Sequence, residues 1–194
     1  VTRPLAASLA MLSLAGLLAL ACLLSFSRGA WASMLGAIAL WGALTLATAG
    51  RATRDRLLLT AIGGLVMTAA VITFALQTDQ AADLLAERAT LVQSYDGGPE
   101  GRFAGQMKAL ALIADNPLGI GALSFSPTYH HEEAHSVYLS MMMNAGWIGG
   151  GLFLILSVAT VALGVLVTLR GGPVAPFLAI ATAAFTGNAL EGWI

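Results

Sequence analysis

The feature that most constrains this chain is its succession of long, uninterrupted apolar runs. A helix that crosses a bilayer needs about 20 apolar residues, and five segments reach that length: about 5–25, 30–49, 57–76, 145–169 and 174–194. The runs are continuous rather than alternating, which excludes the strands of a membrane barrel. Only 10% of the 194 residues are charged, against about 25% in soluble domains. We therefore predict an all-α, polytopic membrane helical bundle.

The spacing of the runs divides the chain into three parts. Residues 1–76 are predicted to hold three transmembrane helices, 77–137 a polar loop with short helices, and 138–194 two further transmembrane helices. The first run is too long, and too closely followed by another, for a cleaved signal peptide. The last run reaches Ile194 without a polar exit. We expect the chain to be part of a larger bundle.

Basic residues indicate the orientation in the membrane. Arg51, Arg54 and Arg56 crowd one short loop, as cytoplasmic loops do. Alternation then predicts that Arg170 is cytoplasmic and that the 77–137 loop is periplasmic. That loop carries eight acidic and three basic residues. Arg28 is the one basic residue at an outer helix end.

The loop itself is predicted to cap the outer face of the bundle. Helical patterns cover about 79–92 and 101–114, a turn covers 95–99, and 116–121 breaks the second helix. Residues 124–129 are predicted as loop, and a helix is expected from about Ala134 into the fourth span. Its glycines are expected to permit close helix packing: Gly146, Gly149, Gly150 and Gly151.

Other composition features exclude several classes of partner. A single cysteine, Cys22, forms no internal disulfide and no multi-cysteine metal site. The net charge of −1, with no basic stripe, predicts no nucleic-acid partner. We expect no cofactor and no bound metal.

Two arginines are candidate anion-binding residues. Arg28 either anchors a helix end among headgroups or donates to a phosphate or pyrophosphate, for which a planar, permanently charged guanidinium is suited. Ser27 would approach the same anion. Arg102, at the start of the second loop helix, is either a solvated charge or a second phosphate contact. Lys108 is predicted to be a solvated surface residue with at most a secondary role in binding the anion.

Three histidines end the polar loop: His130, His131 and His135. The segment His131-Glu132-x-x-His135 fits the pattern of zinc proteases, in which a helix aligns two ligands. A third zinc ligand is not evident in the sequence. A membrane zinc metalloprotease is therefore kept only as an alternative function. His135, at a helix start on the membrane's outer edge, is suited to act as a general base.

A polyprenyl-linked glycan transporter is the other alternative function. A transporter is expected to have charged residues or broken helices at mid-membrane, and Glu191 is the one candidate for such a residue.

Several segments together resemble the O-antigen ligase and polymerase family of bacterial envelope glycan enzymes. The likeness covers about residues 20–155 and rests on these residues: Ser27-Arg28-Gly29, Arg102 before a helix, Asp115-Asn116-Pro117-Leu118-Gly119-Ile120-Gly121, His135-Ser136-x-Tyr138-Leu139, and Gly146. Two positions depart from the family's pattern. Gln106 stands where the family often has tryptophan, and Ser136 where it often has asparagine.

The resemblance implies a multi-pass glycosyltransferase of the bacterial inner membrane whose site faces the periplasm. It would move a glycan from an undecaprenyl pyrophosphate carrier to a hydroxyl of lipid A–core, another glycan or a protein, without a nucleotide sugar or a metal. By position, Arg28 and Arg102 would hold the pyrophosphate and His135 would assist the acceptor hydroxyl. Further candidates for the site are Ser27, Lys108, His131 and Tyr138.

Overall fold

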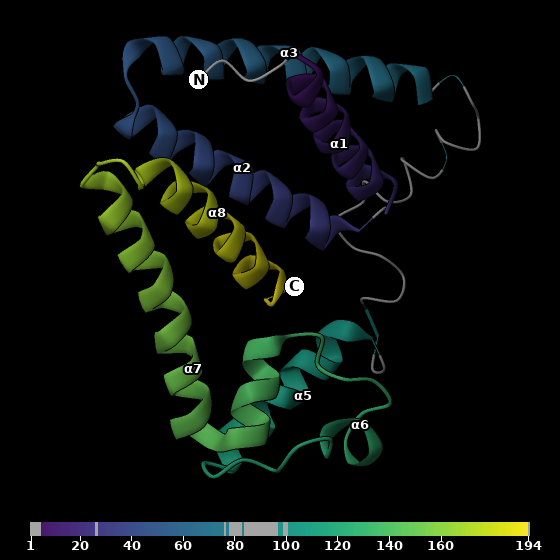
Figure 1. Ribbon diagram of the computed structural model, residues 1–194. Helices are drawn as coiled ribbons and strands as arrows, with labels where there is room; N and C mark the ends of the chain where they lie inside the picture. The colour runs from purple at the N-terminus through teal and green to yellow at the C-terminus, as the bar shows by residue number, and fades with distance from the viewer. Residues whose placement is uncertain are drawn as a thin grey trace.

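The computed structural model is all-helical, which confirms the predicted fold class. It describes residues 5–25, 27–75, 77, 83, 97–98 and 101–193, and these contain helices but no strand. The helices are α1 (Leu5–Leu24), α2 (Arg28–Thr48), α3 (Arg51–Ala75), α5 (Arg102–Asp115), α6 (Phe125–Thr128), α7 (Val137–Leu169) and α8 (Ala175–Glu191) (Figure 1).

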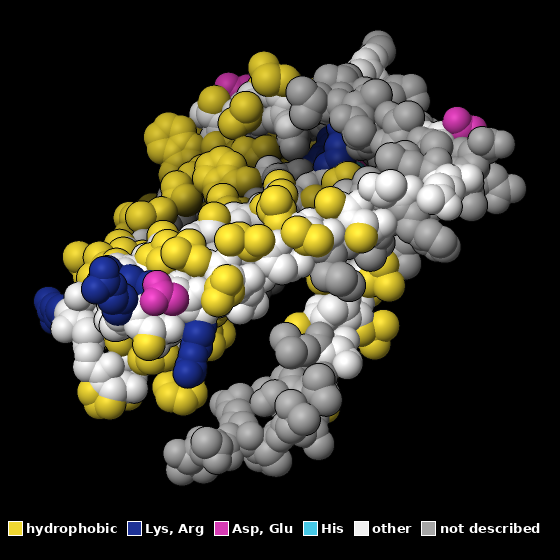
Figure 2. Space-filling view, turned by 90° about the horizontal axis from the view of Figure 1, so that it is seen from above, with side chains coloured by type: hydrophobic (Ala, Val, Ile, Leu, Met, Phe, Trp, Pro, Cys, Tyr) yellow, Lys and Arg dark blue, Asp and Glu magenta, His cyan; other side chains and the backbone are white. Residues whose placement is uncertain are grey.

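The long helices are apolar on all sides. Within the described residues, α2 and α7 are long and apolar enough to cross a membrane. Ile148, Leu152 and Ile155 of α7 are exposed, and Figure 2 shows hydrophobic side chains along much of the visible face. Exposed apolar surface on this scale is unfavourable in water, at about 25 cal/mol per Å², and is covered by lipid in a bilayer. The chain is a membrane protein.

Small residues bring α2, α7 and α8 together. A Cβ added at Gly36 of α2 would lie 2.9 Å from Leu190 Cδ1 of α8, and one at Gly187 would lie 3.1 Å from the Cβ of Ala37. A Cβ at Gly164 of α7 would collide with the hydroxyl of Thr182. Such close approach replaces the hydrophobic driving force that is missing between helices in lipid.

The bundle formed by α2, α7 and α8 has two chemically different ends. The α2–α3 turn and the α7–α8 loop lie at one end, since α2 and α8 run antiparallel (Figure 1). This end carries Arg51 at the start of α3 and Arg170 after α7, and Figure 2 shows Lys and Arg side chains gathered there. The start of α2, the end of α8 and the start of α7 lie at the opposite end, where the Val137 amide donates to Gly192 O at 2.8 Å.

A kink divides α7 into two segments. Gly146 has φ 69° and ψ −172°, a conformation outside the helix and available mainly to glycine. The first segment, 137–145, folds back onto α5 and α6 (Figure 1). The buried side chains of Ala109, Ile113, Phe125, Ala134 and Met143 form the core there. We call residues 101–145, with α5, α6 and this first segment of α7, the cap.

The run 116–121 locks the cap onto the kink. The Trp147 amide donates to Pro117 O at 2.9 Å, and the Ile120 amide donates to Met143 O at 2.6 Å. The Trp147 indole N–H donates to Ile113 O at 2.7 Å. Gly119 has φ +84°, and a Cβ there would lie 2.6 Å from Met143 O. The 115–121 run and Gly146, which both carry the family resemblance, are therefore in contact in the fold.

Several local predictions need correction. Residues 125–128, predicted as loop, form α6, and α7 begins at Val137 rather than near Ala134. Gly146 approaches the backbone of Pro117 rather than another helix. A Cβ at Gly150 would collide with Met142 of α7's own first segment, because the kink folds the helix back on itself. The second loop helix is present as α5, whereas the first, at 79–92, falls largely outside the described residues.

Candidate functional site

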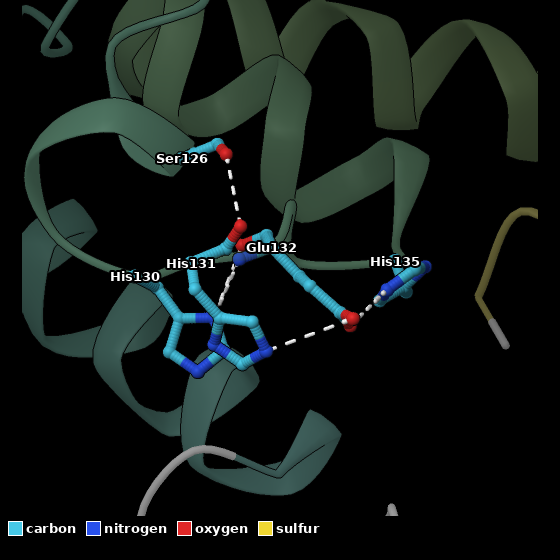
Figure 3. A network of polar contacts seen from close by, with 5 residues as sticks. All are labelled: Ser126, His130, His131, Glu132 and His135. Carbon is cyan, nitrogen blue, oxygen red and sulfur yellow. Dashed lines mark hydrogen bonds and ion pairs between the residues drawn. The ribbon is translucent and has the colours of Figure 1, made fainter.

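Two of the three histidines contact one carboxylate, and the third contacts the backbone of the same residue. His135 Nε2 lies 3.1 Å from Glu132 Oε2, and His131 Nε2 lies 3.6 Å from Glu132 Oε1. Figure 3 shows both rings directed at the Glu132 carboxylate, while the third ring, of His130, contacts the Glu132 backbone. The Ser126 hydroxyl donates to His131 O at 3.3 Å and ties the segment to α6.

The Glu132 carboxylate is held ionised by its histidine neighbours. The hydrogen bond from His135 is the main cause that lowers its pKa below the ordinary value of 4.5, and charge on His131, His135 and His130 acts in the same direction. An ionised carboxylate only accepts hydrogen bonds. In the neutral ring, the contact with this carboxylate places the proton of His135 on Nε2 and the lone pair on Nδ1.

His135 occupies an unusual backbone conformation. Its φ is +50°, in the left-handed region, which costs an L-residue about 1–2 kcal/mol relative to the right-handed form. The next residue, Ser136, caps α7 by accepting from the Leu139 amide at 3.5 Å. The turn at His135 therefore separates the irregular loop from the helix and exposes about half of the imidazole. Non-glycine residues held this way are concentrated at functional sites.

His135 lines an open hollow of about 310 Å³ between the start of α7 and the end of α8. The other polar side chains of the lining come from Glu133, Ser136, Ser140 and Glu191. The Ser136 hydroxyl donates to Gly192 O at 3.3 Å and joins the two helices at this point. Most of the exposed lining is apolar, with Val137 and Met141 among its residues, and one imidazole, two carboxylates and two hydroxyls supply its polar part.

The candidate arginines begin two different helices. Arg28 is the first residue of α2 and is half-buried; α2 begins at the same end of the bundle as the hollow. Arg102 is the first residue of α5 and is also half-buried, and no described residue gives its Nε a hydrogen-bond partner. Each guanidinium therefore lies where a helix N-terminus adds its own favourable field for an anion.

The secondary candidates have varied surroundings. The Ser27 hydroxyl accepts from the Ala30 amide at 3.3 Å and so caps α2. The Tyr138 hydroxyl donates to Ala189 O at 3.1 Å, and its ring stacks on Trp193 at 4.6 Å. Lys108 is exposed on α5. His131 is half-exposed beside Glu132.

The zinc-protease pattern lacks the required backbone. Residues 130–136 are not helical, so His131 and His135 are not aligned one helical turn apart as that pattern requires. Instead, Glu132 lies between them and contacts both rings. In the described part of the chain, no group of three or more His, Cys, Asp or Glu side chains is arranged to hold a metal ion.

The sequence pattern over most of the chain identifies its family. A family model described as O-antigen ligase matches residues 13–154. The chain belongs to the O-antigen ligase family. No curated protein and no solved structure gives a significant match. Members are enzymes of the inner membrane that join glycans delivered on a lipid carrier, within lipopolysaccharide biosynthesis. The chain is therefore an O-antigen ligase family enzyme, and neither the protease nor the transporter alternative holds.

Two residues that were not assigned to the glycan-transfer site from the sequence belong to this region. Glu191 lines the hollow with His135, although it lies 56 positions away; the available signal was a lone carboxylate in an apolar run. His130 is 7% exposed and stacks on Phe125 with ring centroids 6.0 Å apart. The loop sequence has no periodic pattern that predicts this burial.

Proposed function

We propose that this enzyme transfers a glycan from undecaprenyl pyrophosphate to an acceptor hydroxyl at the periplasmic face of the inner membrane. The observation that carries the proposal is the position of His135. Its half-exposed imidazole lines the hollow where the cap meets the end of α8. The family supports lipid A–core as the acceptor. The hollow, where His135 lies beside the polar groups of Ser140 and Glu191, is the proposed acceptor site.

The charge distribution supports the periplasmic orientation. Arg51, Arg54, Arg56 and Arg170 lie at the end of the bundle opposite the hollow. Short cytoplasmic loops are enriched in arginine and lysine. With that end in the cytoplasm, the cap and His135 face the periplasm. The same orientation makes 1–76 and 138–194 the membrane parts and 77–137 the periplasmic part of the chain.

The proposed reaction is a displacement at the anomeric carbon. The acceptor hydroxyl oxygen forms the new bond to that carbon, the bond between carbon and diphosphate oxygen breaks, and the polyprenyl diphosphate leaves with the electron pair. The hydroxyl proton passes to Nδ1 of His135. Glu132, 3.1 Å from Nε2, stabilises the imidazolium as it forms. Diphosphate is a good leaving group, so the chain needs to supply no nucleophile of its own.

Arg28 and Arg102 are proposed to bind the diphosphate. Guanidinium groups stabilise the charge that develops on the leaving oxygens. Ser27 and Tyr138 are assigned to positioning, because their hydroxyls cap α2 and tie α7 to α8. Lys108 and His131 are proposed as peripheral contacts to the substrate.

The proposal is tested by transfer assays in proteoliposomes that contain a lipid-linked glycan and lipid A–core. His135→Ala is expected to lower kcat by about 10²–10⁴-fold, the usual contribution of general base catalysis. Arg28→Ala and Arg102→Ala are each expected to lower the rate by about 10²–10³-fold. Arg170→Ala, an exposed arginine at the opposite end of the bundle, is the matched control and retains wild-type turnover. Unchanged turnover in all three site variants would sink the proposal.

The orientation is tested separately by thiol labelling of intact cells. In a Cys22→Ser background, Ser124→Cys in the cap and Gly50→Cys between α2 and α3 are compared with a membrane-impermeant maleimide. We expect labelling of Ser124→Cys before lysis and of Gly50→Cys only after it. The reverse result contradicts the periplasmic placement.

A further inference from the structure

The buried His130 ring lies over the first turn of α5. A Cβ added at Gly105 would lie 3.1 Å from His130 Cε1 and 3.4 Å from its Nε2. The Cβ of a helical residue points toward the helix N-terminus. The ring therefore covers the turn that precedes Gly105, which begins with Arg102. The absence of a side chain at Gly105 makes room for the ring.

Nε2 of this ring is buried. Nδ1 lies 3.2 Å from the Glu132 amide nitrogen and 3.1 Å from the Glu132 carbonyl oxygen. A neutral ring that accepts from the amide at Nδ1 carries its proton on Nε2. A doubly protonated ring, which donates from Nδ1 to the carbonyl oxygen, also carries a proton on Nε2. The other neutral tautomer donates from Nδ1 to the carbonyl oxygen and leaves Nε2 without a proton.

Two buried nitrogens near the start of α5 have no hydrogen-bond partner among the described residues: His130 Nε2 and Arg102 Nε. With the His130 proton on Nε2, both are donors and cannot satisfy each other. The N-cap residue of α5 is Gly101, which has no side chain to cap the helix. Buried donors in native proteins are nearly always paired, and a bound anion would supply the acceptor that the described residues do not.

We propose that His130 is a substrate-binding residue that donates through Nε2–H to a phosphate oxygen held by Arg102 at the N-terminus of α5. The inference rests on the proposed function, in which Arg102 binds the diphosphate of the lipid carrier. An anion satisfies both donors at once, and the helix N-terminus adds to its binding. His130 moves no proton in this role. It aligns one phosphate oxygen against the half-buried guanidinium.

The test separates the donor hydrogen from the shape of the ring. His130→Phe keeps the stacking on Phe125 and removes the Nε2 donor, whereas His130→Gln keeps an amide donor near the Nε2 position. Tyr129→Phe removes a neighbouring hydroxyl and is the matched control. Binding of inorganic pyrophosphate is measured by calorimetry on the purified chain, and donor KM and kcat are measured in proteoliposomes with lipid-linked glycan. Thermal unfolding monitors the fold.

His130→Phe is expected to weaken pyrophosphate binding and raise donor KM by about 10–100-fold, the size of a charge-assisted hydrogen bond. Its effect on kcat is expected to be smaller. His130→Gln is expected to remain within about threefold of wild type, and Tyr129→Phe to match wild type. If His130→Phe does not fold, His130→Asn replaces it, because its shorter amide reaches only the Nδ1 position.

Three results would overturn the inference. The first is wild-type pyrophosphate binding by His130→Phe, as expected if a water fills the site. The second is an equal loss of binding in His130→Gln and His130→Phe, as expected for a purely structural ring. The third is weaker binding of free pyrophosphate without a change in the KM for the lipid-linked donor. An Arg102→Ala variant with normal turnover overturns the role of Arg102 in binding the diphosphate, on which this inference rests. Impaired Arg102→Ala with normal His130→Phe overturns only the role of His130.

Discussion

The cap and the membrane helices are built by different physical means. The cap has a core of five buried side chains and a loop fastened to α7 by two hydrogen bonds, and a third hydrogen bond joins α7 to α5. The helices α2, α7 and α8 instead expose leucine and isoleucine and approach one another at glycines. In the cap, position is determined by directional contacts. In the bundle, it is determined by how closely backbones can approach.

This difference explains where the candidate chemistry lies. A general base or an anion ligand must be held within a fraction of an ångström of its partner, and directional hydrogen bonds achieve that. His130, His135 and Arg102 lie in the cap, with His135 just before the start of α7, and Arg28 is the first residue of a membrane helix. The apolar helices support the cap and contribute Glu191 at the junction.

The largest effect is expected from a substitution that disrupts the contacts between the 116–121 run and the kink at Gly146. In Gly146→Ala, the new Cβ collides with Pro117 O and Leu118 C at a backbone conformation that alanine rarely adopts. We expect a loss of about 2–5 kcal/mol of unfolding free energy and loss of transfer activity. Unfolding in detergent micelles and limited proteolysis of the cap measure this.

Gly151→Ala is the control for that experiment. It lies in the same helix, has ordinary helical geometry, and nothing lies within 4 Å of its added Cβ. Alanine there should change stability by no more than about 1 kcal/mol. Equal stability of the Gly146 and Gly151 variants would contradict the lock.

A smaller effect is expected from the bundle. Gly164→Ala places a methyl group against Thr182 of α8, and we expect a loss of about 1–3 kcal/mol with an unchanged donor KM in the folded fraction. Gly63→Ala in α3, where nothing lies within 4 Å, is the control. A change in donor KM with unchanged stability would show that the bundle shapes the site directly.

The smallest expected effect concerns the pH dependence of the cap. The pKa of Glu132 is lowered, chiefly by the hydrogen bond from His135, so the folded state favours the ionised carboxylate. The stabilisation is present above the ordinary pKa of 4.5 and is lost as pH falls through the lowered value. Unfolding of the wild type and Glu132→Gln is compared from about pH 6 to pH 3. The wild type is expected to lose stability more steeply, and Glu133→Gln to follow the wild type; parallel curves for wild type and Glu132→Gln refute this.

Parts of the site followed from local sequence and parts did not. The helix at 101–114 was predictable because its apolar residues repeat at helical spacing, and the break after it because Asn116, Pro117 and Gly119 cluster there. Helix α6 was missed because its four residues, Phe125–Thr128, are too few for a periodic pattern. The zinc-protease pattern was misleading because a five-residue match does not report whether its backbone is helical. Ser136 was the available signal for where the helix starts, since serine is a favoured N-cap residue. Here it caps α7 and directly follows His135.

Sequence alone determined that this chain is a bundle of membrane helices with a polar cap, because the length and continuity of apolar runs are local properties that the bilayer imposes. The sequence also indicated the family. The glycines of the 115–121 run adopt a backbone conformation that few other residues can adopt, so this stretch of sequence is distinctive. Tertiary structure decided which polar groups share a site. Gly105 and His130, Pro117 and Gly146, and His135 and Glu191 meet only after the kink in α7 and the antiparallel packing of α7 and α8 bring distant segments together. Contacts between residues so far apart depend on how whole helices pack, which no local pattern encodes.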